Sequence, residues 1–216
     1  MKIYNLIFIA MLLVFFGCSL DTPSEEATVL STGDANFASY AALGNSLTAG
    51  YQSGALTEKH QQYSYVNLIA QQAGVTTFQQ PLIGFPGIGT YSAAGAGIIE
   101  LTFLDNPSSP GSPLLTPAPY ASYPDFNPLA PYASADVMNY AAPYNNLGVP
   151  GALLVDLLQA TNAATSASGA NTMFDVILRN ANPAFGNTTA IQQAALLTPT
   201  FVTCWIGNND VLGYAT

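Results

Sequence analysis

Short apolar runs that end at a glycine and lead into helical spacing recur along this chain. Residues 39–43 form one such run before Gly44, residues 198–206 form another before Gly207, and residues 141–151 combine a strand-like stretch with a glycine turn. Apolar residues at helical spacing occupy 62–74, 152–160, 174–178 and 191–197. Strands that alternate with helices predict a parallel sheet with right-handed crossovers. We therefore expect an α/β fold.

The composition excludes several classes of protein. Half of the residues are apolar, which excludes a disordered chain. The length of 216 residues suits one domain with a single core. Three basic residues stand against twelve acidic ones. This chain therefore lacks the cationic stripe that nucleic-acid binding requires, and we expect no nucleic-acid partner.

The N-terminus has the layout of a secretory signal. Lys2 precedes an apolar run over 3–16, which ends in Gly17 and Cys18. A cysteine directly after a small residue resembles a lipobox, in which Cys18 would be acylated and become the mature N-terminus. A plain signal peptide or a signal anchor is the alternative. The lipobox implies a protein anchored by lipid in a bacterial cell envelope, in the outer membrane on its periplasmic or surface face.

Three regions follow from this division. Residues 1–17 are expected to be the signal peptide, and 18–36, rich in small polar residues, a flexible tether. The domain is expected to span 37–216. Within it, about 84–136 form an insertion that is rich in proline and tyrosine yet too apolar for a free linker. A lid or functional loop and a loop packed on the surface are equally compatible with this composition.

Two further expectations concern single segments. Residues 76–83 are a candidate strand, which Pro81 would confine to a sheet edge or to the strand's end. Cys204 lies in the apolar run 198–206, which we interpret as a buried strand, so we expect its thiol to be buried and inert. With Cys18 acylated, Cys204 has no disulfide partner.

Three polar blocks at 44–47, 146–151 and 207–210 each follow a predicted strand. Ligands bind at the carboxyl ends of parallel strands, so the blocks are expected to share one site. Ser46 would lie on a tight strand-to-helix turn, which exposes a nucleophile. Taken singly, each block has an ordinary explanation. Ser46 can cap a helix, 146–151 can be a strand-to-helix turn, and 207–210 can be a polar β-turn.

Together, in this order, the three blocks resemble the SGNH/GDSL hydrolase family. The resemblance rests on Leu43-Gly44-Asn45-Ser46-Leu47-Thr48-Ala49-Gly50, on 146–151 and on 207–210. It implies a flavodoxin-like, three-layer parallel sheet and a serine ester hydrolase, an esterase or lipase. Ser46 would be the nucleophile, and the oxyanion hole would comprise the N–H groups of Ser46 and Gly148 and the side chain of Asn209. No metal or other cofactor is implied.

The chain departs from the family pattern at two points. The family has Asp before the serine, whereas this chain has Asn45. The family also ends in Asp-x-x-His, which is absent here, and the single histidine, His60, is interpreted as a surface residue. We therefore expect a fragment whose sheet is incomplete at the C-terminus, and which is inactive by itself because no general base accompanies the serine.

The substrate stays open at this point. The apolar insertion favours a lipid or long-chain ester, whereas Tyr91, Tyr120, Tyr123 and Tyr132 within it favour an acylated glycan. The alternative to an enzyme is a non-catalytic envelope lipoprotein that binds lipid or glycan in the same cleft. A purely structural envelope protein is a third hypothesis, which the three blocks disfavour.

Overall fold

The structure, a computed structural model, describes residues 31–85, 87–89, 99–105, 111, 113–119, 135–167 and 169–215. The chain divides into two units, Met1–Ser31 and Thr32–Thr216, and the account below concerns the second. The predicted signal peptide, the acylated Cys18 and most of the tether lie outside the described residues, as do much of the 84–136 insertion and its four tyrosines. Within the described ranges, no helix has the length and apolar character that crossing a membrane requires.

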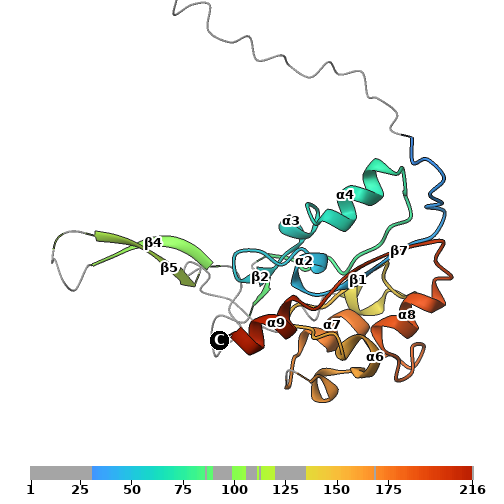
Figure 1. Cartoon of the computed structure of the whole chain (residues 1–216). Helices are drawn as coiled ribbons and strands as arrows, with labels where there is room; N and C mark the ends of the chain where they lie inside the picture. The colour runs from blue at the N-terminus through green and yellow to red at the C-terminus, as the bar shows by residue number, and fades with distance from the viewer. Residues whose placement is uncertain are drawn as a thin grey trace, which may run out of the picture. The chain divides into compact units, whose positions relative to one another are not determined.

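A parallel three-stranded sheet forms the centre of this unit (Figure 1). Its strands are β1 (Tyr40–Gly44), β6 (Asn146–Gly148) and β7 (Phe201–Trp205), in the order β6-β1-β7. Leu43 of the central strand pairs with Leu147 on one side and Cys204 on the other. Every residue of β1 is buried, as its continuous apolar run predicts for a strand covered on both faces. The predicted α/β fold is confirmed at this level.

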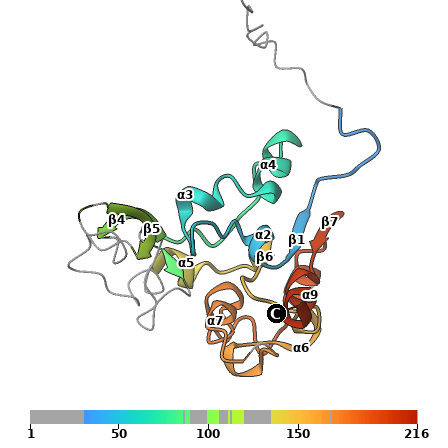
Figure 2. The ribbon, with the colours of Figure 1, turned by 60° about the vertical axis from the view of Figure 1, so that its left-hand side comes forward.

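Helices cover both faces of the sheet (Figure 2). Side chains of a strand alternate between its faces, and β1 follows this rule. Tyr40 and Ala42 belong to an apolar cluster with α4 (Tyr65–Gln72), whereas Ala41 and Leu43 belong to a larger cluster on the other face. That larger cluster receives side chains from α6 (Asp156–Gln159), α7 (Met173–Leu178) and α8 (Ala190–Leu196). The chain is therefore layered as helix, sheet and helix.

The remaining elements are short. The helices are α2 (Ser46–Ala49), α3 (Glu58–Gln61), α5 (Ala135–Asn139), α9 (Asn208–Ala215) and the 3-10 turn η1 (Ala163–Thr165). Two antiparallel pairs accompany the main sheet, namely β2 (Ala55–Leu56) with β3 (Ile88–Gly89), and β4 (Ile99–Asp105) with β5 (Pro113–Pro119). The second pair is a hairpin of two seven-residue strands inside the predicted insertion.

Local capping residues explain where the predicted helices begin and end. The Ser64 side chain caps α4, and Gly74 follows this helix in the left-handed conformation at φ +70°. Thr189 and Gln192 form a reciprocal capping box at the start of α8. The helix predicted over 152–160 is reduced to α6, and the Asp156 carboxylate accepts from the N–H of Leu153 in the turn before it. The predicted helices at 174–178 and 191–197 are present as α7 and α8.

The strand predicted over 76–83 is wrong. Gln79 lies beside Asn145 and Asn146, whose N–H groups both donate to its carbonyl oxygen. The Gln79 N–H, however, donates to the side-chain Oδ1 of Asn145 at 2.9 Å. A side chain therefore takes the place of the backbone partner that a ladder would need, and Pro81 offers no N–H at all.

The prediction that Cys204 is buried is also wrong. Within the described residues β7 pairs only with β1, so it forms an edge of the sheet. Its side chains are partly or fully exposed, with Val202 at 45% and Cys204 in the exposed class. Partial desolvation nevertheless raises the pKa of the Cys204 thiol. The apolar run predicted the strand correctly, but neighbouring elements decide its burial.

One cation is enclosed in the core. Arg179, which follows α7 at φ +52°, is 0% exposed. Its guanidinium donates to the carbonyl oxygens of Tyr140 and Ala142, and its carbon lies 4.1 Å from the ring centre of Tyr144 and 4.7 Å from that of Phe185. No carboxylate among the described residues pairs with it. Burial lowers the pKa of Arg179, since the cation loses its hydration.

Candidate active site

Hydrogen bonds join the three polar blocks at one edge of the sheet. The N–H of Val149 donates to Gly44 O at 3.0 Å, which links the second block to the first. Asn209 Nδ2 donates at 2.8 Å to the carbonyl oxygen of Ala152, the residue immediately after the second block, and so links the third block to the end of the second. Asn45 Nδ2 lies 3.4 Å from Asn208 Oδ1, which closes the ring between the first block and the third. The blocks therefore meet, as parallel strands with aligned carboxyl ends require.

Ser46 is the first residue of α2 and is separated from the buried strand β1 by Asn45 alone. Its side chain is partly exposed. Neither its hydroxyl nor its N–H forms a hydrogen bond with the residues that the structure describes. The hydroxyl is therefore free to react, and the N–H points from the start of a helix, where such groups face negative charge favourably.

Two glycines allow α2 to approach the sheet closely. A Cβ on Gly44 would collide with the Thr48 side chain and with the carbonyl oxygen of Trp205. A Cβ on Gly148 would lie 2.5 Å from the backbone nitrogen of Ala49. Only glycine fits at these two positions, and the position of Ser46 depends on both.

Gly148 was predicted from the resemblance to supply an oxyanion donor. Its N–H is buried and donates to Asn146 Oδ1 at 3.0 Å. Gly148 also does not belong to the residues that line the pocket at Ser46. The structure therefore gives Gly148 a packing role, in which it lets β6 contact α2. Whether its N–H has any part in catalysis stays a prediction.

Gly151 is a further backbone donor at this site, although the resemblance did not point to it. It lines the same pocket as Ser46, and its N–H donates to no group in the described part of the chain. Its φ of +80° requires glycine or another residue that tolerates the left-handed region. Asn171 holds this turn, since its Nδ2 donates to Pro150 O at 2.8 Å. The place of Gly151 as the last glycine before the helix predicted over 152–160 could have indicated this donor from the sequence. Nothing in the sequence pointed to Asn171.

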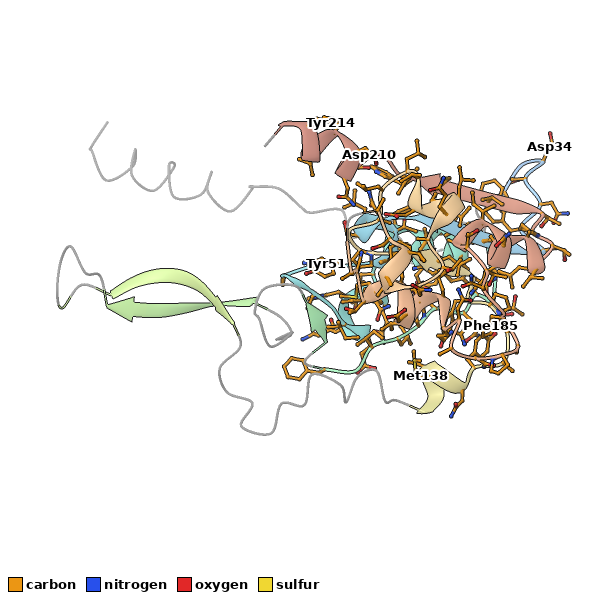
Figure 3. All side chains as sticks on the ribbon, turned by 90° about the horizontal axis from the view of Figure 1, so that it is seen from below. Asp34, Tyr51, Met138, Phe185, Asp210 and Tyr214 are labelled. Carbon is orange, nitrogen blue, oxygen red and sulfur yellow. The ribbon has the colours of Figure 1, made fainter. Side chains whose placement is uncertain are left out.

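Asn209 and Asp210 hold the second block from the other side. Asn209 uses one of its two amide hydrogens on Ala152 O, and the second has no partner among the described residues. Like Gly148, however, Asn209 does not belong to the residues that line the Ser46 pocket. Both oxygens of the Asp210 carboxylate accept from the Leu154 N–H, at 3.2 and 3.0 Å. Figure 3 shows Asp210 at the start of α9. Asp210 therefore holds the segment 152–154 through the backbone N–H of Leu154.

The pocket at Ser46 has a volume of about 420 Å³. Besides Ser46 it is lined by residues of four short segments: Tyr51, Gly89, Pro150, Gly151, Gly169, Ala170, Asn171, Thr172 and Met173. No histidine or carboxylate is among these lining residues. His60 lines a different pocket, which Tyr51 also borders. The described residues therefore place no general base in contact with the Ser46 pocket.

Comparison with family models, with curated proteins and with solved structures finds no match for this chain. The described residues also contain no cluster of three or more His, Cys, Asp or Glu side chains that could hold a metal ion. The function of this chain must therefore be inferred from the geometry of the three blocks.

Asn45 has a role that an aspartate could not fill. It is 1% exposed, and its Oδ1 accepts from the Leu47 N–H as a helix cap. Its Nδ2 donates to Asn208 Oδ1, which also accepts from the indole N–H of Trp205 at 3.0 Å. The indole N–H of Trp205 orients the Asn208 side chain so that its oxygen, rather than its amide nitrogen, faces residue 45. The side chain at position 45 must therefore be a hydrogen-bond donor. Asn45 stands where the SGNH/GDSL pattern has Asp, and the surrounding hydrogen bonds of Asn208 and Trp205 favour the asparagine.

We expect Asn45→Asp to lower the free energy of unfolding by about 1–3 kcal/mol. The carboxylate would face the Asn208 oxygen without a proton between them, and this loss exceeds the gain of about 0.3–1 kcal/mol from a charge at a helix start. Urea unfolding followed by circular dichroism measures the change. Asn67→Asp is the matched control, because Asn67 lies in the first turn of α4 and the hydrogen bond that its side-chain amide donates to Gln62 O is exposed. An Asn45→Asp protein as stable as the control would contradict the assigned donor role.

Proposed function

We propose that this sequence supplies the nucleophile and oxyanion hole of a serine ester hydrolase of the SGNH/GDSL type. The observation that carries the proposal is the meeting of the three blocks at Ser46. Among the described residues, the Ser46 hydroxyl, the N–H groups of Ser46 and Gly151 and one amide hydrogen of Asn209 have no hydrogen-bond partner, and all of them belong to these joined blocks. Such preorganised donors stabilise the negative charge that develops on an ester carbonyl oxygen.

The order of the strands supports the same proposal. Numbered by their place in the chain, the three strands of the main sheet run second-first-third. This is the beginning of the flavodoxin-like order 2-1-3-4-5, in which ligands bind where the order reverses. The Ser46 turn follows the first strand, at that reversal. A flavodoxin-like sheet of the SGNH/GDSL type is thus part of the proposal.

The reaction would proceed through an acyl-serine intermediate. Ser46 Oγ attacks the ester carbonyl, its proton passes to a base, the alkoxide leaving group takes up that proton, and water then releases the acid by the same route. None of the residues that line the Ser46 pocket can act as the base at neutral pH. We therefore expect these 216 residues to hydrolyse esters only when a base is supplied to them.

Acylation of Cys18 would place this hydrolase on a bacterial envelope membrane. The proposal rests on the sequence alone, namely the basic start, the apolar run and the small residue before the cysteine. With a net charge of −9, attachment would depend on the lipid rather than on anionic headgroups. The ester substrate would then be a lipid or an acylated glycan of that envelope.

Imidazole can supply the missing base from solution and so provides the test. We expect a fluorophosphonate probe to label Ser46 slowly in buffer and at least about tenfold faster with imidazole, which accepts the serine proton as fluoride leaves phosphorus. Mass spectrometry of the digested protein identifies the labelled residue.

Ser46→Ala is the control and should abolish the imidazole-dependent label. Ser166, whose hydroxyl donates to Ala163 O, serves as an internal reference because it lacks the proposed donors. Labelling that is independent of imidazole, or equal at both serines, would contradict a poised nucleophile. The rival function, a non-catalytic binding lipoprotein, would then be favoured.

A further inference from the structure

A second pocket lies on the other side of the first turn of α2. It has a volume of about 350 Å³, at the low end of the roughly 300–1,000 Å³ that is usual for ligand sites. Ser46 lines the first pocket and the next residue, Leu47, lines the second. Tyr51 borders both. A ligand in the second pocket would therefore lie next to a group that reacts at Ser46.

Aromatic side chains dominate the lining of this second pocket. Four of its residues carry rings with a polar tip or edge: Tyr51, Tyr63, Tyr65 and Trp205. Tyr63 is 72% exposed and Trp205 is 49% exposed, so both rings are open to a ligand. The rings of Tyr65 and Trp205 lie 5.6 Å apart at 51°. Exposed rings of this kind offer apolar faces while their polar atoms stay in contact with water.

The ring positions are fixed by hydrogen bonds at the far ends of the side chains. The Tyr65 hydroxyl lies 3.1 Å from Thr48 Oγ1, and Thr48 is itself buried in α2. The Trp205 indole N–H donates to Asn208. Both rings are therefore preorganised, and a ligand would not have to order them on binding.

The polar groups of the pocket are uncharged or weakly basic. Gln52, Ser64 and His60 line it, and no aspartate, glutamate, lysine or arginine does. His60 is partly exposed, although its Nδ1 atom is buried and has no hydrogen-bond partner among the described residues. The pocket thus matches a neutral ligand with several hydroxyl groups and with apolar C–H faces.

We infer that this pocket binds a neutral sugar ring of an acylated glycan, whose ester then reaches Ser46. A lipid acyl chain would require an aliphatic lining, and Leu47 is the one aliphatic side chain among the residues that line the pocket. The inference deepens the proposed esterase function and rests on it for the ester, but sugar binding itself requires no turnover.

Trp205 provides a direct readout, because it is the single tryptophan of the chain. We would titrate the full chain carrying Ser46→Ala, so that hydrolysis cannot contribute, and follow tryptophan fluorescence. The probes are xylotetraose, cellotetraose and chitotetraose, with monomeric dihexanoylphosphatidylcholine as the lipid. The expected result is a saturable change with at least one oligosaccharide and none with the lipid.

Two substitutions at one exposed position test whether the ring contributes. Tyr63→Ala should raise the Kd for the bound oligosaccharide between about three- and tenfold, whereas Tyr63→Phe should leave it within about twofold. Tyr214→Ala is the matched control and should not change the Kd. Tyr214 is 95% exposed and, as Figure 3 shows, lies on α9 well away from Tyr51.

Three outcomes would overturn the inference. They are a response to the lipid alone, no response to any of the three oligosaccharides, and equal weakening by Tyr63→Ala and Tyr214→Ala. Fluorophosphonate labelling separates this inference from the proposed function. Sugar binding without a reactive Ser46 would support the sugar-binding pocket and contradict the proposed esterase function. A reactive Ser46 without sugar binding would support the esterase function and contradict the sugar-binding pocket.

Discussion

Gly148→Ala should lower the free energy of unfolding by about 3 kcal/mol or more. The added methyl group would lie 2.5 Å from the nitrogen of Ala49 and 2.8 Å from the carbonyl carbon of Thr48. Both are backbone atoms of α2, so no side chain can rotate away, and the helix must move off the sheet. Because Ser46 begins this helix, the same substitution should also abolish imidazole-dependent labelling of Ser46.

Gly84→Ala is the control for this prediction. No atom lies within 4 Å of a Cβ built on Gly84, and its φ is not in the left-handed region. Its stability should stay within about 0.5 kcal/mol of the parent in the same urea titration. A difference of less than about 1 kcal/mol between the unfolding free energies of Gly148→Ala and this control would be no larger than a usual surface effect. Such a result would refute the close approach of β6 to α2.

Arg179→Ala should cost about 3–5 kcal/mol of unfolding free energy. The substitution leaves the buried carbonyl oxygens of Tyr140 and Ala142 without a donor and opens a cavity among the rings of Tyr144 and Phe185. The loss would loosen the segment between α5 and β6 from α7. Arg179→Lys should fall between the parent and alanine, because an ammonium cannot donate to both carbonyls in the planar geometry of arginine.

Lys59→Ala is the matched control, because Lys59 is exposed on α3. Its stability should change by no more than about 0.5 kcal/mol. Chemical denaturation of the variants, fitted with one common slope, measures the differences. Should Arg179→Ala prove as stable as Lys59→Ala, the guanidinium would have no part in holding these segments together.

Local patterns in the sequence were sufficient to predict several elements. The continuous apolar run before Gly44 predicted β1, and the helical spacing before Gly74 predicted α4. The reason is that burial on both faces of a strand, or on one face of a helix, imposes a repeat that is visible within a few residues. The glycine-containing blocks likewise predicted a common edge of the sheet, because parallel strands align their carboxyl ends.

Contacts between distant segments decided what local patterns could not. Residues 198–206 and 39–43 have similar apolar runs, yet within the described residues β1 is central and buried whereas β7 is an edge strand with an exposed Cys204. Residues 76–83 have strand-like composition, but the Asn145 side chain takes the hydrogen bond that a ladder would need. Strand neighbours and side-chain partners of this kind are not encoded in the periodicity of a single segment.

The candidate site divides in the same way. The sequence by itself determined Ser46 as the candidate nucleophile, placed at a helix start after a buried strand. Only the tertiary structure showed that the Gly148 N–H is bound by Asn146, that Gly151 lines the Ser46 pocket, and that Arg179 is enclosed by aromatic rings. The physical reason is that a donor is free or satisfied, and a charge exposed or buried, according to groups that the fold brings from elsewhere in the chain.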